Sequence, residues 1–82
     1  MFINKASAGR NNICGVNIAI RRKAMKISQR ELSDQLQLVG LDVDKNAVQR
    51  IESGKRFVTD IELIGFANVF QVTVEELLKD TE

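Results

Sequence analysis

Residues 28–56 read SQRELSDQLQLVGLDVDKNAVQRIESGKR and contain two short helical patterns joined by a link. The stretch opens with a Ser-x-x-Glu capping box, in which the hydroxyl and the carboxylate each satisfy a backbone N–H at the start of a helix. Asp44 is of a residue type that caps helix N-termini, and Gly54 fits the position just beyond a helix end. The stretch therefore predicts helices over 29–38 and 45–53.

The same capping pattern occurs twice more, at Thr59 and at Thr73, and each time it precedes an apolar segment. The chain has no proline, so no helix interior loses a backbone donor to a ring nitrogen. An apolar segment with helical spacing also precedes residue 28. We therefore predict an all-α fold with five helices, over 13–25, 29–38, 45–53, 60–70 and 74–79.

The third of these segments has two different faces when residues 45–52 are placed at about 100° per residue. One face is apolar. The other presents four side chains of the types that hydrogen-bond to base edges in the major groove: Lys45, Asn46, Gln49 and Arg50. Lys55 and Arg56 follow directly and are placed to contact phosphates. A solvated polar face without a ligand is the alternative interpretation of so short a helix.

The chain resembles the Cro and lambda-repressor-like helix-turn-helix family, also called the xenobiotic-response-element family. Three stretches carry the likeness: SQRELSDQLQ, NAVQRIESGKR and ELIGFANVFQVTVEELL. The resemblance covers about residues 13–79. It implies a compact bundle of five helices that binds double-stranded operator DNA, usually as a homodimer.

The resemblance also implies roles for single residues. Helix 45–53 would be the recognition helix, and Gln29 and Arg30 would lie at the DNA backbone. Arg22 and Glu52 match a structural ion pair that joins the first helix to the third.

The link between the second and third helices is longer than is usual in the family. It contains four apolar residues, so we expect it to pack against the domain: Leu38, Val39, Leu41 and Val43. Either a longer helix or a bulging loop accommodates the extra residues. The angle of the recognition helix is left open by this insertion.

The first predicted helix carries two apolar stripes at helical spacing. One consists of Cys14, Ile18 and Met25, and is interrupted by Arg21, where the family usually has an apolar residue. The other consists of Ile13, Val16, Ile20 and Ala24. A broadly buried helix is the simpler account, and contact of the second stripe, together with Phe2 and Ile3, with a partner or a second copy is the alternative. We place the three downstream phenylalanines in the core: Phe57, Phe66 and Phe70.

Composition narrows the classes of function. One cysteine and no histidine exclude an internal disulfide and argue against a structural zinc site, and we expect Cys14 to be a small buried residue rather than a reactive thiol. Without histidine, a Gly-rich phosphate loop or paired carboxylates, we expect no enzyme, no metal and no cofactor. No run of residues is long and apolar enough for a membrane span or a signal peptide, which predicts a cytoplasmic protein.

Charge is distributed unevenly, although the net charge is only +1. Residues 1–30 carry seven cationic side chains and no acidic one, whereas residues 57–82 carry six acidic and one cationic. A positive face and a negative end can orient a protein on a polyanion. We predict a flexible arm over 1–12, a DNA-binding domain over 13–79 and a tail over 80–82. The expected function is sequence-specific regulation of transcription, as a repressor; an antitoxin-like module that docks a partner protein is the alternative.

Overall fold

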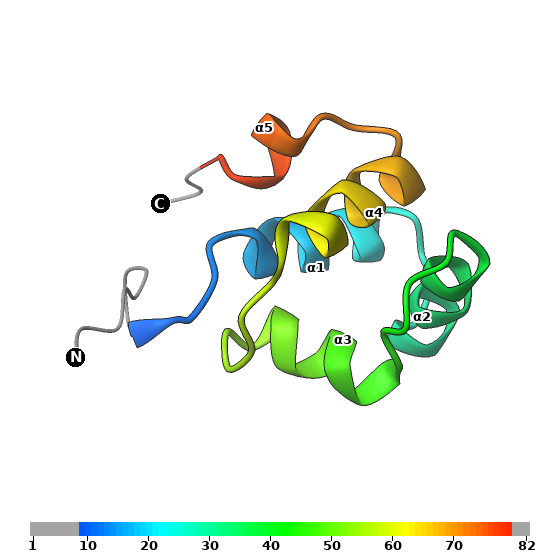
Figure 1. Cartoon of the computed structure of the whole chain (residues 1–82), viewed down its shortest axis with the longest axis horizontal. Helices are drawn as coiled ribbons and strands as arrows, with labels where there is room; N and C mark the ends of the chain where they lie inside the picture. The colour runs from blue at the N-terminus through cyan, green and yellow to red at the C-terminus, as the bar shows by residue number, and fades with distance from the viewer. Residues whose placement is uncertain (1–8, 80–82) are drawn as a thin grey trace.

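Five helices form the described part of the chain, residues 9–79, in a computed structural model. They are α1 (Cys14–Ala24), α2 (Gln29–Leu38), α3 (Lys45–Glu52), α4 (Asp60–Phe70) and α5 (Val74–Leu77). Within residues 9–79 no strand is present. α1 packs against α3, α4 and α5, while α2 packs against α3 and α4 (Figure 1). The predicted all-α architecture is confirmed, and α1, α3 and α5 are slightly shorter than predicted.

The predicted capping interactions begin four of these helices. Ser28 Oγ accepts a hydrogen bond from the backbone nitrogen of Glu31 at 3.0 Å, and Glu31 Oε1 accepts from the backbone nitrogen of Ser28 at 2.9 Å. The boxes that start at Thr59 and Thr73 are formed in the same way. Asp44 Oδ1 accepts from a backbone nitrogen in the first turn of α3 at 2.8 Å. Local side-chain chemistry therefore sets where α2, α3, α4 and α5 begin.

The end of α3 has the geometry that the glycine predicts. Gly54 has a φ of 84°, and its backbone nitrogen donates to the carbonyl oxygen of Ile51 at 3.1 Å. The backbone nitrogen of Lys55 donates to the carbonyl oxygen of Arg50 at 2.9 Å. These two bonds form a Schellman motif, which turns the chain sharply after the helix.

The core gathers side chains from all five helices and from the link. Its members are Cys14, Ile18, Leu32, Leu36, Val43, Val48, Ile51, Phe66, Ala67, Phe70 and Leu77. Phe66 and Phe70 stack with ring centroids 6.4 Å apart, as expected for core aromatics. The prediction for Phe57 is wrong, because this residue lies in the loop before α4 and its side chain is exposed.

The long link packs against the domain through only two of its four apolar residues. Val43 is buried, and the Leu41 side chain occupies the space that a β-carbon at Gly65 of α4 would need. Leu38 is 86% exposed and Val39 is exposed as well, so the expectation is wrong for these two. α2 ends at Leu38, and the residues that leave its last turn project into solvent before the link reaches the core.

Of the two predicted stripes on α1, only one is buried, and only in part, because its third member Met25 is exposed. Cys14 and Ile18 lie in the core, whereas Ile13 and Ile20 of the second stripe are exposed. The prediction of a broadly buried α1 is therefore wrong. Burial raises the pKa of the Cys14 thiol to about 11, which disfavours the reactive thiolate and agrees with the structural role expected of this residue.

A polar side chain from α1 hydrogen-bonds to the backbone at the end of α5. Asn17 is 8% exposed, and its Nδ2 donates to the carbonyl oxygens of Leu77 and Lys79 at 2.8 and 2.7 Å. Because Leu77 is the last residue of α5 and Lys79 lies just beyond it, this amide supplies donors where the helix itself has none left.

Candidate nucleic-acid interface

α3 presents a polar face to solvent. Val48 and Ile51 point into the core and are fully buried. The four side chains proposed to contact bases are all exposed on the other side of the helix: Lys45, Asn46, Gln49 and Arg50. The predicted division of this helix into an apolar and a polar face is confirmed, and contact with bases remains a prediction.

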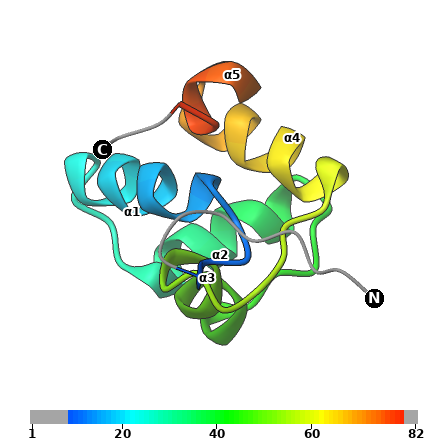
Figure 2. The same cartoon turned by 90° about the vertical axis from the view of Figure 1, so that its left-hand side faces the viewer.

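The position of α3 leaves that polar face open. Figures 1 and 2 both show α3 at one edge of the bundle and α5 at the opposite edge, with α1 and α4 between them. The exposed carboxylates of Glu75 and Glu76 belong to α5. These two carboxylates are thereby kept away from α3, which favours approach of a polyanion to the α3 edge, although the exposed Asp44 lies at the start of α3.

The pair that the resemblance placed between the first and third helices is present. Arg22 Nε lies 2.7 Å from Glu52 Oε2, and Arg22 Nη2 donates to Glu52 Oε1 at 3.1 Å. The two side chains are 13% and 9% exposed. The hydrogen bonds to Glu52 raise the pKa of Arg22, so the guanidinium stays charged. A bidentate pair in this position fixes the orientation of α3 relative to α1.

Gln29 takes part in the same network. Its Nε2 donates to Glu52 Oε1 at 3.1 Å, so the first residue of α2 is tied to the last residue of α3. Arg30, the next residue of α2, is exposed. The structure therefore gives Gln29 a role between helices in addition to the proposed phosphate contact.

The two cations after α3 have different surroundings. Lys55 is exposed, as a phosphate contact requires. Arg56 is instead engaged by Glu62, with Nη1–Oε1 and Nη2–Oε2 distances of 3.0 and 2.9 Å. This pairing holds the pKa of the Glu62 carboxyl below its ordinary value. Arg56 thus braces the start of α4, and Lys55 is the more available of the two for DNA.

Three residues of the predicted flexible arm are fixed against the end of α3. Arg10, Asn11 and Asn12, here called the N-terminal clasp, donate hydrogen bonds of 2.7 to 3.4 Å to backbone carbonyls. The acceptors are the carbonyls of Ile51, Glu52, Gly54, Lys55 and Arg56. The last three residues of the predicted arm over 1–12 are therefore ordered and belong to the domain. The rest of the arm up to residue 8, and the predicted tail over 80–82, lie outside the described residues. The sequence signal for the clasp was a run of donor side chains just before the first apolar segment.

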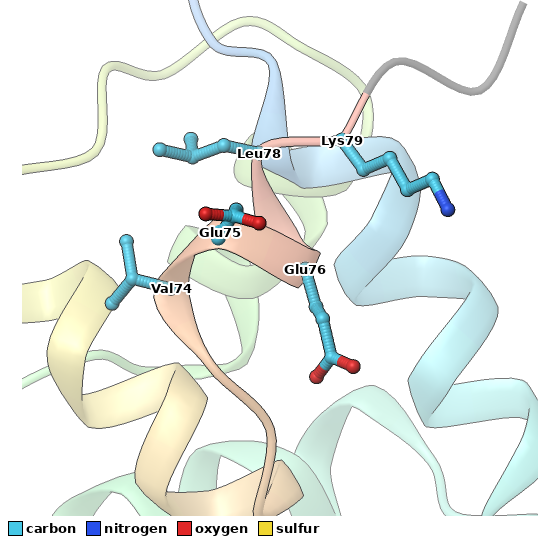
Figure 3. A pocket seen from close by; sticks show the side chains of 5 residues that line it. All are labelled: Val74, Glu75, Glu76, Leu78 and Lys79. Atoms are coloured by element: carbon cyan, nitrogen blue, oxygen red, sulfur yellow. The ribbon is translucent and has the colours of Figure 1, made fainter.

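Other surface features lie away from α3. A pocket of about 610 Å³ lies against α5 and the residues just after it, and Figure 3 shows its lining of Val74, Glu75, Glu76, Leu78 and Lys79.

Among the described residues, no group of His, Cys, Asp or Glu side chains is arranged to hold a metal ion. Within residues 9–79, no helix is both long and apolar enough to cross a membrane.

Comparison with known proteins agrees with this geometry. A helix-turn-helix family model (HTH_3) matches residues 18–77. The structure is similar to that of the P22 c2 repressor protein, solved in complex with a synthetic operator, with a TM-score of 0.70 and 25% identity over 83% of this chain and 96% of that one. It is also similar to the restriction-modification controller protein C.AhdI from Aeromonas hydrophila, with a TM-score of 0.67 and 26% identity over 78% of this chain and 86% of that one. No match was found among curated proteins. The chain belongs to the Cro/C1-type helix-turn-helix family of DNA-binding transcription regulators.

Proposed function

We propose that this regulator is a repressor that reads a specific operator by inserting α3 into the major groove. The observation that carries the proposal is the exposed polar face of α3, with Lys45, Asn46, Gln49 and Arg50 on a helix whose other face is buried. A helix fits the major groove, and these residue types match the donors and acceptors of guanine and adenine there. The similarity to a repressor solved with its operator supports the same mode of binding.

Backbone contacts would hold α3 in register. Arg30 near the start of α2 and Lys55 after the end of α3 are both exposed, and Gln29 lies at the N-terminus of α2, where backbone N–H groups favour a phosphate. Regulation in this scheme needs binding alone, with no catalysis, cofactor or metal. Binding that rests on phosphate contacts weakens steeply as salt rises.

Selection from a random pool of duplex DNA at near-physiological salt tests the proposal. The wild-type chain should enrich one sequence motif, and the double variant Asn46→Ala/Arg50→Ala should lose it. Arg21→Ala/Asn68→Ala is a matched control, because it removes an exposed arginine and an exposed asparagine outside α3. Arg50→Ala alone should weaken binding to the selected site by roughly 1–3 kcal/mol. A folded wild-type chain that enriches nothing would refute the proposal and favour the antitoxin-like alternative.

We also propose that the chain binds as a homodimer through an exposed apolar surface next to the interface. Ile61 and Ile64 lie three residues apart on α4 and share a face, and Phe57 lies in the loop just before α4. All three side chains are exposed. Phe57 is only two residues after Lys55 in the chain, so a second copy packed on this surface about a two-fold axis can present a second α3 to the same duplex. Two half-sites would then lie about 34 Å apart along the DNA.

Sedimentation equilibrium distinguishes this interface from other exposed apolar residues. Ile61→Glu should shift the chain toward monomer and weaken binding to a two-half-site duplex more than to a single half-site. Leu38→Glu is the matched control, since Leu38 is also an exposed aliphatic residue but lies at the end of α2. Equal dimerisation of wild type and Ile61→Glu would exclude this surface as the interface.

A further inference from the structure

The N-terminal clasp donates hydrogen bonds to the backbone carbonyl oxygens at the end of α3, although it lies about 40 residues away in the sequence. The last carbonyl groups of a helix have no partners within it. Asn12, 8% exposed, donates from Nδ2 to the carbonyl oxygens of Ile51 at 3.0 Å and Arg56 at 2.7 Å. Its Oδ1 accepts from the backbone nitrogen of Gly15 at 2.8 Å. One buried amide thus connects the start of α1 to both sides of the turn that follows α3.

Arg10 reinforces the same end of the helix. Its Nη2 donates to the carbonyl oxygen of Glu52 at 2.9 Å, and its side chain lies across Gly54, where an added β-carbon would come within 2.8 Å of Arg10 Cγ. A guanidinium at a helix C-terminus also interacts favourably with the helix dipole. Gly54 therefore serves two purposes: it turns the chain, and it leaves room for Arg10.

The clasped segment carries side chains that the proposed interface needs. Arg50 directly precedes Ile51, whose carbonyl is the first that the clasp engages, and exposed Lys55 lies among the clasped residues. Side chains that read bases must be held within about 0.5 Å of a productive geometry. A distant substitution that misplaces such a group by about 1 Å is costly. A clasp on the backbone between these two side chains constrains both of them.

We propose that Arg10 and Asn12 are positioning residues for DNA recognition, which set the end of α3 and the turn with Lys55 without contacting DNA themselves. The inference rests on the proposed function, since it concerns discrimination between DNA sequences. It predicts that loss of the clasp reduces preference for the operator beyond what the loss of stability explains.

Asn12→Ser is the informative variant. Serine can still cap the first turn of α1, but it is too short to reach Ile51 and Arg56. Asn17→Ser is its matched control, because Asn17 is equally buried and also donates to two carbonyls at a helix end, those of α5. Arg10→Gln is a second and milder variant, since Arg10 is only half-buried.

The measurement is the ratio of affinities for the selected and a scrambled duplex, at a temperature where circular dichroism shows each variant folded. Asn12→Ser and Arg10→Gln should lower this ratio by about tenfold, roughly the discrimination carried by one base pair. Asn17→Ser should keep the wild-type ratio. The slope of affinity against salt should be unchanged in Arg10→Gln, because Arg10 faces carbonyl oxygens rather than phosphates.

Different failures have different meanings. If the affinity ratio of Asn12→Ser equals that of Asn17→Ser, the clasp is only structural and the inference is wrong. A salt slope that falls by about one in Arg10→Gln would identify Arg10 as a phosphate contact, which also overturns it. A wild-type chain without any preference between the duplexes would instead refute the proposed function, and the inference with it.

Discussion

Removal of the Arg22 guanidinium tests how α3 is attached to α1. Arg22→Met keeps much of the aliphatic stem but removes both hydrogen bonds to the Glu52 carboxylate. Glu52 then retains the hydrogen bond from Gln29 and no cationic partner. A carboxylate that is only 9% exposed is left with most of its desolvation uncompensated.

The size of the effect follows from this burial. Breaking a buried pair by removal of one partner costs about 3–5 kcal/mol, and we expect about 3 kcal/mol here because the edge of the pair is open to water. The double variant Arg22→Met/Glu52→Leu removes both charges, so its loss should be only about 1 kcal/mol. If Glu52→Leu alone costs about 1–2 kcal/mol, the double-mutant cycle yields a coupling of about 3–4 kcal/mol.

Urea unfolding followed by circular dichroism at neutral pH measures all four corners of this cycle. The coupling should change little in about 0.5 M salt, because a buried pair is weakly screened. A double variant that loses the sum of the two single losses would show no coupling. The ion pair would then contribute nothing to the attachment of α3, contrary to our reasoning.

Three further predictions concern stability and reactivity. Gly15→Ala should destabilise the fold by about 1–3 kcal/mol in urea, because an added β-carbon overlaps the carbonyl oxygen of Ile51; a variant as stable as wild type would contradict this close approach. Glu62→Gln keeps a side chain suited to the capping box but loses the charge that pairs with Arg56, and should cost about 1 kcal/mol at pH 7. Because the pKa of Glu62 is lowered from 4.5 in the folded state, this contribution to stability is complete above pH 4.5 and is lost as the pH falls through the lower folded-state pKa. A stability difference between Glu62→Gln and wild type that persists to pH 2 would refute this account. The Cys14 thiol, with its pKa raised to about 11, should react with a disulfide reagent at pH 8 only as fast as the chain unfolds, and rapid labelling of the native protein would contradict its burial.

Helix starts were predictable because their chemistry is local. A Ser or Thr and a Glu three residues later can satisfy each other's backbone groups whatever the rest of the chain does. The polar face of α3 was predictable for a similar reason, since helical spacing alone separates Val48 and Ile51 from Gln49 and Arg50. Both predictions depend only on residues within one or two turns of each other.

The clasp and the Asn17 contacts could not be predicted in this way. Asn12 bonds to Ile51, 39 residues away, and Asn17 bonds to Leu77, 60 residues away. An asparagine carries no periodic signal, and its acceptors are backbone carbonyls that every residue possesses. The pairing becomes visible only when the packing of α1 against α3 and α5 is known.

The exposure of several apolar residues could not be predicted for a related reason. Spacing predicts which residues share a face, but not how far a neighbouring element extends over that face. Ile13 and Ile20 share a stripe on α1 that the other described helices leave exposed, and Leu38 lies at the last turn of α2, where the chain turns away. Leu41 packs well because Gly65 on α4 leaves room for it, a match between positions 24 residues apart in sequence.

The long link does not set the angle of α3 by itself, because α3 is held at its end as well as at its start. Its start follows Val43, which is buried in the core, and is capped by Asp44. Its last residue, Glu52, is bonded to Arg22 of α1. The turn beyond it is bonded to the N-terminal clasp. Extra residues between α2 and Val43 can therefore project outward, as Leu38 does, while the contacts of α3 with α1 and the clasp determine which face of the helix is offered to DNA.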